Sequence, residues 1–500
     1  MKVFVFSTHA AWQPHLETEL EIIQGHLDKG DAVYRFTCAG ELPICDVNTE
    51  HTLAGCVQCR DMSSCGKSLL DGSITDLPLI HKGENVKAKA EEISFNYDSA
   101  EVLQGTYVEN FDVGSAVLSS LISWVREPKI NIEAHRKEIG EGMKSALLVY
   151  FSALEYIKEL KPDVIYCFNG RLVHARPILR AAAAAGVECM VHERGNNKNF
   201  YMLFKNTTSH DRKNAVQLMY DLWAKAPLES REATGAKFYT ERAEGKEQGW
   251  YSFTNEQVKG LLPEGWDATK RNVIIFNSSE DEFASIGPDW KNDLYTTQLE
   301  AIPRIIKDCE QFDDIHFYLR VHPNLANVEN SETKAIEKLS FKNLTIIDSK
   351  SKISTYDLLF NCEKILAFGS SVGIEAVYWG KPSIQAGKSY YHEMDATYKP
   401  ETHAELIEMI GKKLEPMSKT PALIYGHYFK TFGIPYKYYV AETLATGTYK
   451  GVNINKQAAS FNKKYKDVEK KGALNLPLRL LGLDYRLNKR KIYSFIKAPK

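Results

Sequence analysis

The chain has 500 residues, more than one hydrophobic core usually serves, so we expect two domains with added segments. Hydrophobic residues make up 44% and charged residues 25%, as in ordinary globular proteins, and a net charge of −1 argues against a nucleic-acid-binding protein. Nine cysteines in so long a chain argue against a disulfide-built secreted fold, and the absence of any apolar run near ~18 residues argues against a membrane span, so we expect a cytoplasmic protein.

The first half of the chain alternates strands and helices. Its start reads as a first strand rather than a signal peptide. Residues 38–75 are rich in Cys, Gly, Asp and Ser, and we expect an irregular insertion there. Apolar runs and amphipathic patterns predict strands at 2–6, 32–37, 163–168 and 187–191, and helices at 17–29, 136–160 and 177–185.

A second β/α series follows a polar, mostly helical stretch and a Gly/Pro-marked linker near 260–267. The fold class we expect is therefore α/β, with two Rossmann-like domains facing a cleft, at 1–265 and 266–440, and a basic C-terminal extension at 441–500. The second series predicts strands at 272–276, 315–321, 343–347, 364–368 and 382–384, and helices near 295–307, 354–361, 371–379 and 402–414.

Two short segments carry the chemistry of this second series. Arg320-Val321-His322-Pro323-Asn324 follows one predicted strand, and Gly369-Ser370-Ser371-Val372-Gly373-Ile374-Glu375-Ala376 follows another and opens a helix. Ligands of open α/β sheets lie outside the carboxyl ends of the strands. Imidazole, guanidinium, hydroxyl and main-chain N–H groups at that edge would hold a phosphate.

This pair of segments resembles the C-terminal half of bacterial glycosyltransferases with two Rossmann-like domains (the GT-B architecture), in particular capsule and surface-polysaccharide enzymes such as Kdo transferases and sialyltransferases. The resemblance covers roughly residues 270–400. It implies that His322 acts in catalysis at the donor phosphate. It further implies that Ser370 and Ser371 contact this phosphate. We expect Arg320, Asn324 and Gly373, which lie in the same two segments, to belong to the donor site as well, since a guanidinium and main-chain N–H groups bind phosphate.

Two further groups of the second domain have alternative interpretations. Glu375 either accepts hydrogen bonds from the ribose or base of a nucleotide or complements the helix dipole. Ser278 and Ser279, which follow the first strand of the domain, contact phosphate or sugar, or else cap a helix.

An inverting transfer needs a base from the N-terminal domain, and our first candidate is Glu193. The resemblance supports it, since sialyltransferase-like enzymes place an acid-x-Gly motif in this role, although Arg194 stands where a second acid is usual. Arg194 would hold Glu193 ionised. Arg171 binds an acidic acceptor sugar or forms an ion pair, and the reserve bases are His9, His15 and His192.

The cysteines of the insertion have a metal-knuckle spacing at Cys56 and Cys59, which Cys38 and Cys45 would complete as a structural zinc site. The alternative is four reduced thiols without a metal. No Asp-x-Asp signature follows a predicted strand, so we expect a metal-independent reaction that needs no cofactor beyond its nucleotide-sugar substrate.

Residues 461–500 hold twelve Lys/Arg and three acidic residues, a net charge of +9, with Leu, Tyr and Phe between them. This composition favours peripheral contact with the inner face of the cytoplasmic membrane, or else a solvated helix packed on the core.

The sequence thus predicts a glycosyltransferase that moves a sugar from a nucleotide donor, CMP-linked in the first interpretation, to a growing bacterial surface polysaccharide or lipopolysaccharide, with inversion. Its partners would be the nucleotide-sugar and the glycan acceptor. The alternatives are a CDP-polyol phosphotransferase of teichoic-acid type, a sugar-nucleotide 2-epimerase, and a non-catalytic glycan-binding or assembly protein on the same fold.

Overall fold

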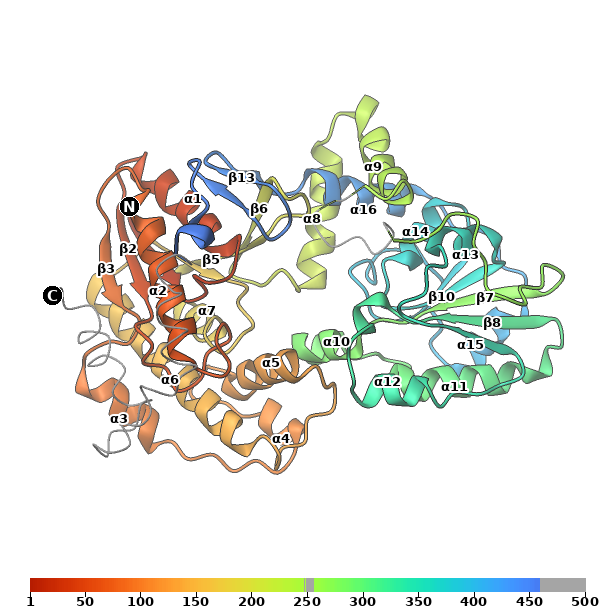
Figure 1. The fold of residues 1–500 in the computed structure, drawn as a ribbon, viewed down its shortest axis with the longest axis horizontal. Helices are drawn as coiled ribbons and strands as arrows, with labels where there is room; N and C mark the ends of the chain where they lie inside the picture. The colour runs from red at the N-terminus through yellow and green to blue at the C-terminus, as the bar shows by residue number, and fades with distance from the viewer. Residues whose placement is uncertain (247, 249–255, 459–500) are drawn as a thin grey trace. The chain divides into compact units, whose positions relative to one another are not determined.

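The computed structural model describes residues 1–246, 248 and 256–458, and the chain forms two compact units (Figure 1). The first contains residues 1–124 and 130–209 and the described residues from 433 onward; the second contains 125–129 and 210–432. The main part of the second unit therefore begins at 210, earlier than the boundary at 265 that we expected. The basic tail lies outside the described residues, so our expectation for it stays a prediction.

The first unit is built on a seven-stranded sheet in the order β12-β6-β5-β4-β1-β2-β3. The five strands from β3 to β5 are parallel and follow the 3-2-1-4-5 order of a doubly wound sheet, while β6 and β12 add an antiparallel edge. The strands are β1 (Lys2–Ser7), β2 (Ala32–Thr37), β3 (Thr75–Pro78), β4 (Val164–Phe168), β5 (Glu188–Arg194), β6 (Phe200–Lys205) and β12 (Ile434–Pro435).

Helices accompany this sheet, and the central strand β1 is fully buried from Val3 to Phe6, as a parallel strand with both faces covered should be. The predicted long helix is confirmed as α6. The helices are α1 (His15–Leu27), α2 (Leu53–Ser68), α3 (Glu84–Glu92), α4 (Ala100–Gln104), α5 (Val113–Val125), α6 (Arg136–Leu160) and α7 (Arg176–Ala184).

The cysteine-rich insertion is not irregular throughout, which corrects our expectation. Residues 53–68 form α2, whose buried side chains include Leu53, Val57 and Met62. Thr52 caps it by accepting a hydrogen bond from the Gly55 N–H at 3.2 Å. The glycines and cysteines of α2, of which Cys56 and Gly66 are buried, weakened the apolar pattern that predicts a helix.

A second difference lies at β5, which runs on to Arg194 rather than ending at 191. The antiparallel partner β6, which the sequence pattern did not reveal, pairs Glu193 with Met202 and Arg194 with Tyr201. Glu193 is thus held inside the end of a strand rather than in a loop after it.

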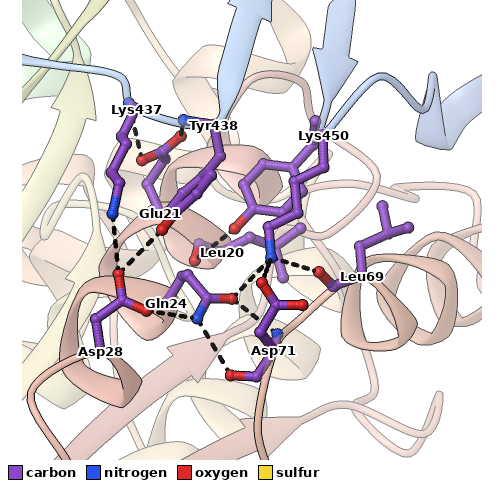
Figure 2. A network of polar contacts seen from close by, with 10 residues as sticks. Leu20, Glu21, Gln24, Asp28, Leu69, Asp71, Lys437, Tyr438 and Lys450 are labelled. Atoms are coloured by element: carbon purple, nitrogen blue, oxygen red, sulfur yellow. Dashed lines mark hydrogen bonds and ion pairs between the residues drawn. The ribbon is translucent and has the colours of Figure 1, made fainter.

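The last described segment returns to the first unit as the hairpin β13 (Tyr439–Ala441) and β14 (Gly447–Tyr449). Figure 2 shows the polar contacts that attach this part of the chain to α1 and to the turn after α2. The Glu21 carboxylate accepts the main-chain N–H groups of Lys437 and Tyr438, and Lys450 Nζ lies 2.7 Å from the Asp71 carboxylate. The C-terminal extension we expected at 441–500 therefore begins as part of the first unit.

The second unit carries a five-stranded, wholly parallel sheet in the order β11-β10-β7-β8-β9. This is the same 3-2-1-4-5 order, so the expectation of two Rossmann-like α/β domains is confirmed. The strands are β7 (Arg271–Phe276), β8 (Ile315–Arg320), β9 (Leu344–Ile347), β10 (Lys364–Phe368) and β11 (Ser383–Gly387).

Helices that follow these strands cover the sheet. They are α10 (Glu280–Ile286), α11 (Gln298–Asp308), α12 (Ser331–Ile336), α13 (Thr355–Asn361), α14 (Val372–Tyr378) and α15 (His403–Gly411), with short 3₁₀ turns η1 (Pro288–Trp290), η2 (Cys309–Gln311) and η3 (Pro323–Leu325).

The helices α8 (Arg212–Lys225) and α9 (Leu228–Ala243) belong to this unit because they pack on α16 (Thr420–Thr431). At the crossing of α9 and α16, a Cβ on Gly235 would lie 2.3 Å from the Leu423 carbonyl oxygen, so only glycine allows this approach. Tyr239 of α9 is fully buried and stacks on Tyr378 of α14 at 4.2 Å. Among the described residues, no helix combines the length and the apolar run that a bilayer crossing requires.

Candidate functional site

The three polar segments of the second unit lie at one edge of its sheet. Figure 1 shows β10, β7 and β8 side by side. Phe276 pairs with Ala367 on one side and with Arg320 on the other, so the segments after these strands begin at the same level. The edge between β7 and β10 is the topological switch point, where doubly wound sheets bind their ligands.

His322 is fixed by the segment beside it. Its main-chain N–H donates to Asn277 Oδ1 at 2.8 Å, and its Nδ1 accepts from the Asn324 N–H at 3.1 Å. Burial, and then the nearby charges of Arg320 and Arg126, lower the pKa of His322 to about 4. The ring is therefore neutral near pH 7, and because Nδ1 accepts, its proton lies on Nε2.

Two buried side chains, Gln298 and Glu332, fix the segment after β7 by hydrogen bonds to its main chain. Gln298 accepts the Ser278 N–H at 3.2 Å and donates to the Ser278 carbonyl at 2.7 Å, and it also donates to Glu332 at 2.6 Å. Burial raises the pKa of Glu332 to about 8 and that of Glu280 to about 7. Within the described residues the Ser278 hydroxyl makes no hydrogen bond, so it remains available to a ligand.

The sequence pattern did not reveal Arg126, which lies 153 residues before Ser279 in the chain but contacts this segment. Its guanidinium donates to Ser279 Oγ at 3.1 Å and pairs with the buried carboxylate of Asp281. Ser279 Oγ donates in turn to Asp281 at 2.5 Å. Arg126 brings a partly exposed positive charge to the edge, next to His322.

In the segment after β10, the Ser370 hydroxyl can donate to a ligand, whereas Ser371 and Glu375 bond to other side chains of the protein. Ser370 Oγ accepts the Val372 N–H at 3.3 Å, which leaves its proton free to donate. Ser371 Oγ donates to Glu375 at 3.0 Å. Glu375 is 1% exposed and also accepts from Tyr356 at 2.6 Å and pairs with Arg242 at 3.2 Å.

This network bears on the two interpretations of Glu375. Both carboxylate oxygens already have partners inside the second unit, so the side chain orders α14 and the Ser371 turn. A contact with ribose or base would have to replace one of these bonds. The partner Arg242 gave no sequence signal, because it lies on α9, in the polar and mostly helical stretch before the linker.

Like Glu375, the Arg320 side chain already forms hydrogen bonds within the protein. Its guanidinium donates to the main-chain carbonyls of Asp348 at 2.5 Å and Ser351 at 3.0 Å, and the residue is 3% exposed. Burial lowers its pKa to about 10, so it stays charged at neutral pH. It holds the loop after β9 against the His322 segment. Asn324, by contrast, reaches toward α10, where its amide donates to Glu282.

At position 373 there is room only for glycine, because the Tyr391 hydroxyl lies where a Cβ would be. A Cβ there would lie 2.2 Å from the Tyr391 hydroxyl oxygen, whose proton is donated to the Ser370 carbonyl at 2.6 Å. Tyr391 is 1% exposed, so it has no room to withdraw. The glycine therefore allows the tyrosine to fix the Ser370 turn.

We expect Gly373→Ala to destabilise the second unit by about 1–3 kcal/mol because the added methyl overpacks this contact. Combining it with Tyr391→Phe removes the clashing oxygen, so the double variant should be more stable than Gly373→Ala alone, as measured by urea unfolding. Gly25→Ala is the control, because no atom lies within 4 Å of its Cβ. A double variant no better than the single one would contradict this geometry.

The first unit has its own polar edge at the ends of β1, β4 and β5. Glu193 is 7% exposed and accepts hydrogen bonds from Asn169 Nδ2 at 2.9 Å and from the Arg194 N–H at 2.9 Å. His15 Nδ1 lies 4.0 Å from the Glu193 carboxylate, and its ring packs on Phe168 at 3.9 Å. Burial, with the charges of His192 and Arg194, holds the pKa of His15 well below its usual value, so that ring is neutral.

The other predicted residues of this edge are placed as follows. Arg171 Nη1 donates to Ser119 Oγ at 2.8 Å and Ser123 Oγ at 3.2 Å, which attaches the β4 loop to α5. The reserve bases His9 and His192 are fully buried. Their side chains would need a ligand-induced movement to reach an acceptor.

The four cysteines proposed for zinc lie within the described residues, and none of them forms a disulfide. Cys56 and Cys59 lie on α2, and Cys38 contacts Glu41 at 3.8 Å. Among the described residues, the cysteines do not form a group whose ligand atoms lie within 4.8 Å of one another. Burial raises the pKa of Cys59 to about 12, so a metal would have to displace a firmly held proton.

No known protein family matches the sequence, and no curated protein matches it. Solved structures with a similar course of the chain include three sugar-processing enzymes. KpsC β-Kdo 2,4-transferase of Thermosulfurimonas dismutans is 11% identical, with a TM-score of 0.37 over 53% of this chain and 79% of that one. UDP-GlcNAc 2-epimerase of Neisseria meningitidis, bound to UDP-GlcNAc, is 12% identical, with a TM-score of 0.30 over 85% and 97%. The spinosyn rhamnosyltransferase SpnG is 11% identical, with a TM-score of 0.26 over 86% and 96%.

Proposed function

We propose that this protein is a nucleotide-sugar-dependent glycosyltransferase whose second unit binds the donor. The observation that carries the proposal is the convergence of three polar segments at the ends of β10, β7 and β8, beside the switch point of a doubly wound sheet. Such an edge binds nucleotides in other proteins of this topology, and its hydroxyl and imidazole groups suit the phosphate of a sugar nucleotide.

The groups assigned to the phosphate are the His322 Nε2–H and the hydroxyls of Ser278 and Ser370. All three are donors, and a sugar nucleotide needs donors at its phosphate because negative charge grows there as the sugar departs. Arg126 adds a positive charge at the same edge. Arg320 and Glu375 serve as positioning residues, since they fix the loops that carry these donors.

Transfer then requires a base for the acceptor hydroxyl, and we assign it to Glu193 of the first unit. The base takes the hydroxyl proton, the acceptor oxygen forms a bond to the anomeric carbon, and the bond from that carbon to the phosphate oxygen breaks. The electron pair leaves with the nucleotide phosphate. Attack from the face opposite the leaving group inverts the anomeric configuration.

The finer assignment is a CMP-linked donor and a bacterial surface polysaccharide as acceptor. It rests on the resemblance of the His322 and Ser370-Ser371 segments to Kdo transferases and sialyltransferases. The basic residues 461–500 would then hold the enzyme at an anionic membrane surface, where lipid-linked acceptors lie.

A thermal-shift panel with CMP, CDP, UDP, GDP and TDP tests the proposal. A nucleotide that binds the folded protein raises its unfolding temperature by mass action, so we expect a shift with CMP that grows with concentration. A variant with Ser278 and Ser370 replaced by alanine should lose most of it. If none of the five nucleotides shifts the transition, the proposal is wrong. Product analysis separates the alternatives, because a phosphotransferase forms a phosphodiester instead of a glycosidic bond.

A further inference from the structure

Three buried side chains of the kinds that bind metal ions lie close together in the first unit, although they are far apart in the sequence. His9 follows β1, Asp46 lies between β2 and α2, and His174 lies between β4 and α7. Within residues 1–246, 248 and 256–458, they are the group of His, Cys, Asp and Glu side chains whose ligand atoms all lie within 4.8 Å of one another. His9 and His174 are 0% exposed and Asp46 is 4% exposed.

The atoms that face one another have no hydrogen-bond partner. These are Asp46 Oδ2, His9 Nε2 and His174 Nδ1. Asp46 Oδ2 lies 3.5 Å from His9 Nε2 and 3.6 Å from His174 Nδ1. Burying a carboxylate oxygen with two imidazole nitrogens and no bond among them is costly, on the order of several kcal/mol, unless something lies between them.

The spacing of these atoms fits a metal ion better than it fits hydrogen bonds. An N–H···O bond is ~2.9 Å long, so 3.5 and 3.6 Å are too long for good ones. Two ligands bound to a tetrahedral zinc at ~2.1 Å lie about 3.4 Å apart. The two measured separations are close to that edge length.

Two of the three ligands, His9 and Asp46, are already oriented by contacts on the side away from the group. His9 Nδ1 lies 2.7 Å from Thr8 Oγ1, and Asp46 Oδ1 accepts from Ser120 Oγ at 2.6 Å. Ser120 Oγ itself accepts the Val173 N–H at 2.8 Å. Such outer contacts fix ring and carboxylate orientation in metal sites.

We propose that His9, Asp46 and His174 bind one divalent transition-metal ion of the zinc class as a closed, structural site. Two imidazoles and one carboxylate are a zinc ligand set, and a buried water or the second Asp46 oxygen would complete the coordination. The ion would tie together the chain segments after β1, β2 and β4. It takes no part in the transfer reaction and is independent of the proposed function.

Metal content of the purified full-length protein tests this site. After treatment with a chelator and dialysis against Zn²⁺, we expect about one firmly held ion per chain by mass spectrometry. Asp46→Asn and His174→Gln should each lower retention at least tenfold. The matched control is His26→Gln, since His26 is also a buried histidine beside an aspartate, Asp31 at 2.7 Å, but lies outside the group.

Cobalt replacement distinguishes this site from the cysteines. Co²⁺ bound by imidazole and carboxylate should absorb in the visible range without the near-ultraviolet thiolate band that cysteine ligands give. Zn²⁺ should also raise the unfolding temperature of the wild type but not of His174→Gln. Sub-stoichiometric zinc in the wild type, a thiolate band, or full retention by both Asp46→Asn and His174→Gln would overturn the proposal. If one variant does not fold, the other decides.

Discussion

Replacing Glu193 with glutamine should lower kcat by about 10³-fold, which is about 4 kcal/mol of transition-state stabilisation, while the donor's KM stays unchanged. The amide keeps the size of the side chain but cannot take the acceptor proton. Donor affinity is spared because the groups assigned to the donor belong to the second unit. Initial rates over a range of donor concentrations, with the released nucleotide measured directly, separate the two quantities.

Glu188→Gln is the matched control for this prediction. It changes the same residue type on the same strand, but at the far end of β5, where Glu188 pairs with Lys205. It should keep wild-type turnover and show that the strand tolerates the exchange. Turnover by Glu193→Gln at the wild-type rate would move the base elsewhere, with His15 as the next candidate because it lies 4.0 Å away.

Much of this fold follows from local sequence pattern. Buried parallel strands such as Lys364–Phe368 are short apolar runs, and the bounds of this strand are predicted to the residue, whereas β5 and β11 each end three residues later than expected. The strand β6 and the helix α2 were missed for opposite reasons. The first is a continuous apolar run without the alternation that marks a half-buried strand, and the second carries cysteines and glycines that weaken its helical period.

Part of the candidate site could likewise be predicted from the sequence, and part could not. That His322 and Ser370 lie at one sheet edge could be predicted, because the carboxyl ends of parallel strands share an edge. The side chains that hold the segments of this edge in place, Arg126, Arg242 and Glu332, could not be predicted, since they approach from helices and turns far away in the chain. The sequence pattern shows which strand a residue follows, but it does not show which distant side chain will form a hydrogen bond or an ion pair with that residue.

His322→Ala should raise the donor's KM and lower kcat, each about tenfold, because it removes a hydrogen bond to a charged phosphate, worth about 1.5–3 kcal/mol. The loss in kcat reflects the part of that bond that strengthens as the leaving group gains charge. His316→Gln is the control, on the same strand but at the opposite end, where His316 contacts Thr345 at 2.9 Å. Steady-state kinetics of both variants against the wild type measure the effect.

The pH profile then tests whether the ring acts as a neutral donor. The pKa of His322 is lowered to about 4, so the ring should not change charge between about pH 5.5 and about pH 8. The ratio of kcat/KM between wild type and His322→Ala, which reports the free enzyme, should therefore stay constant over that range. A histidine of ordinary pKa, ~6.5, would gain a proton as the pH falls and bind phosphate more tightly, so a ratio that rises below about pH 6.5 would contradict the neutral imidazole.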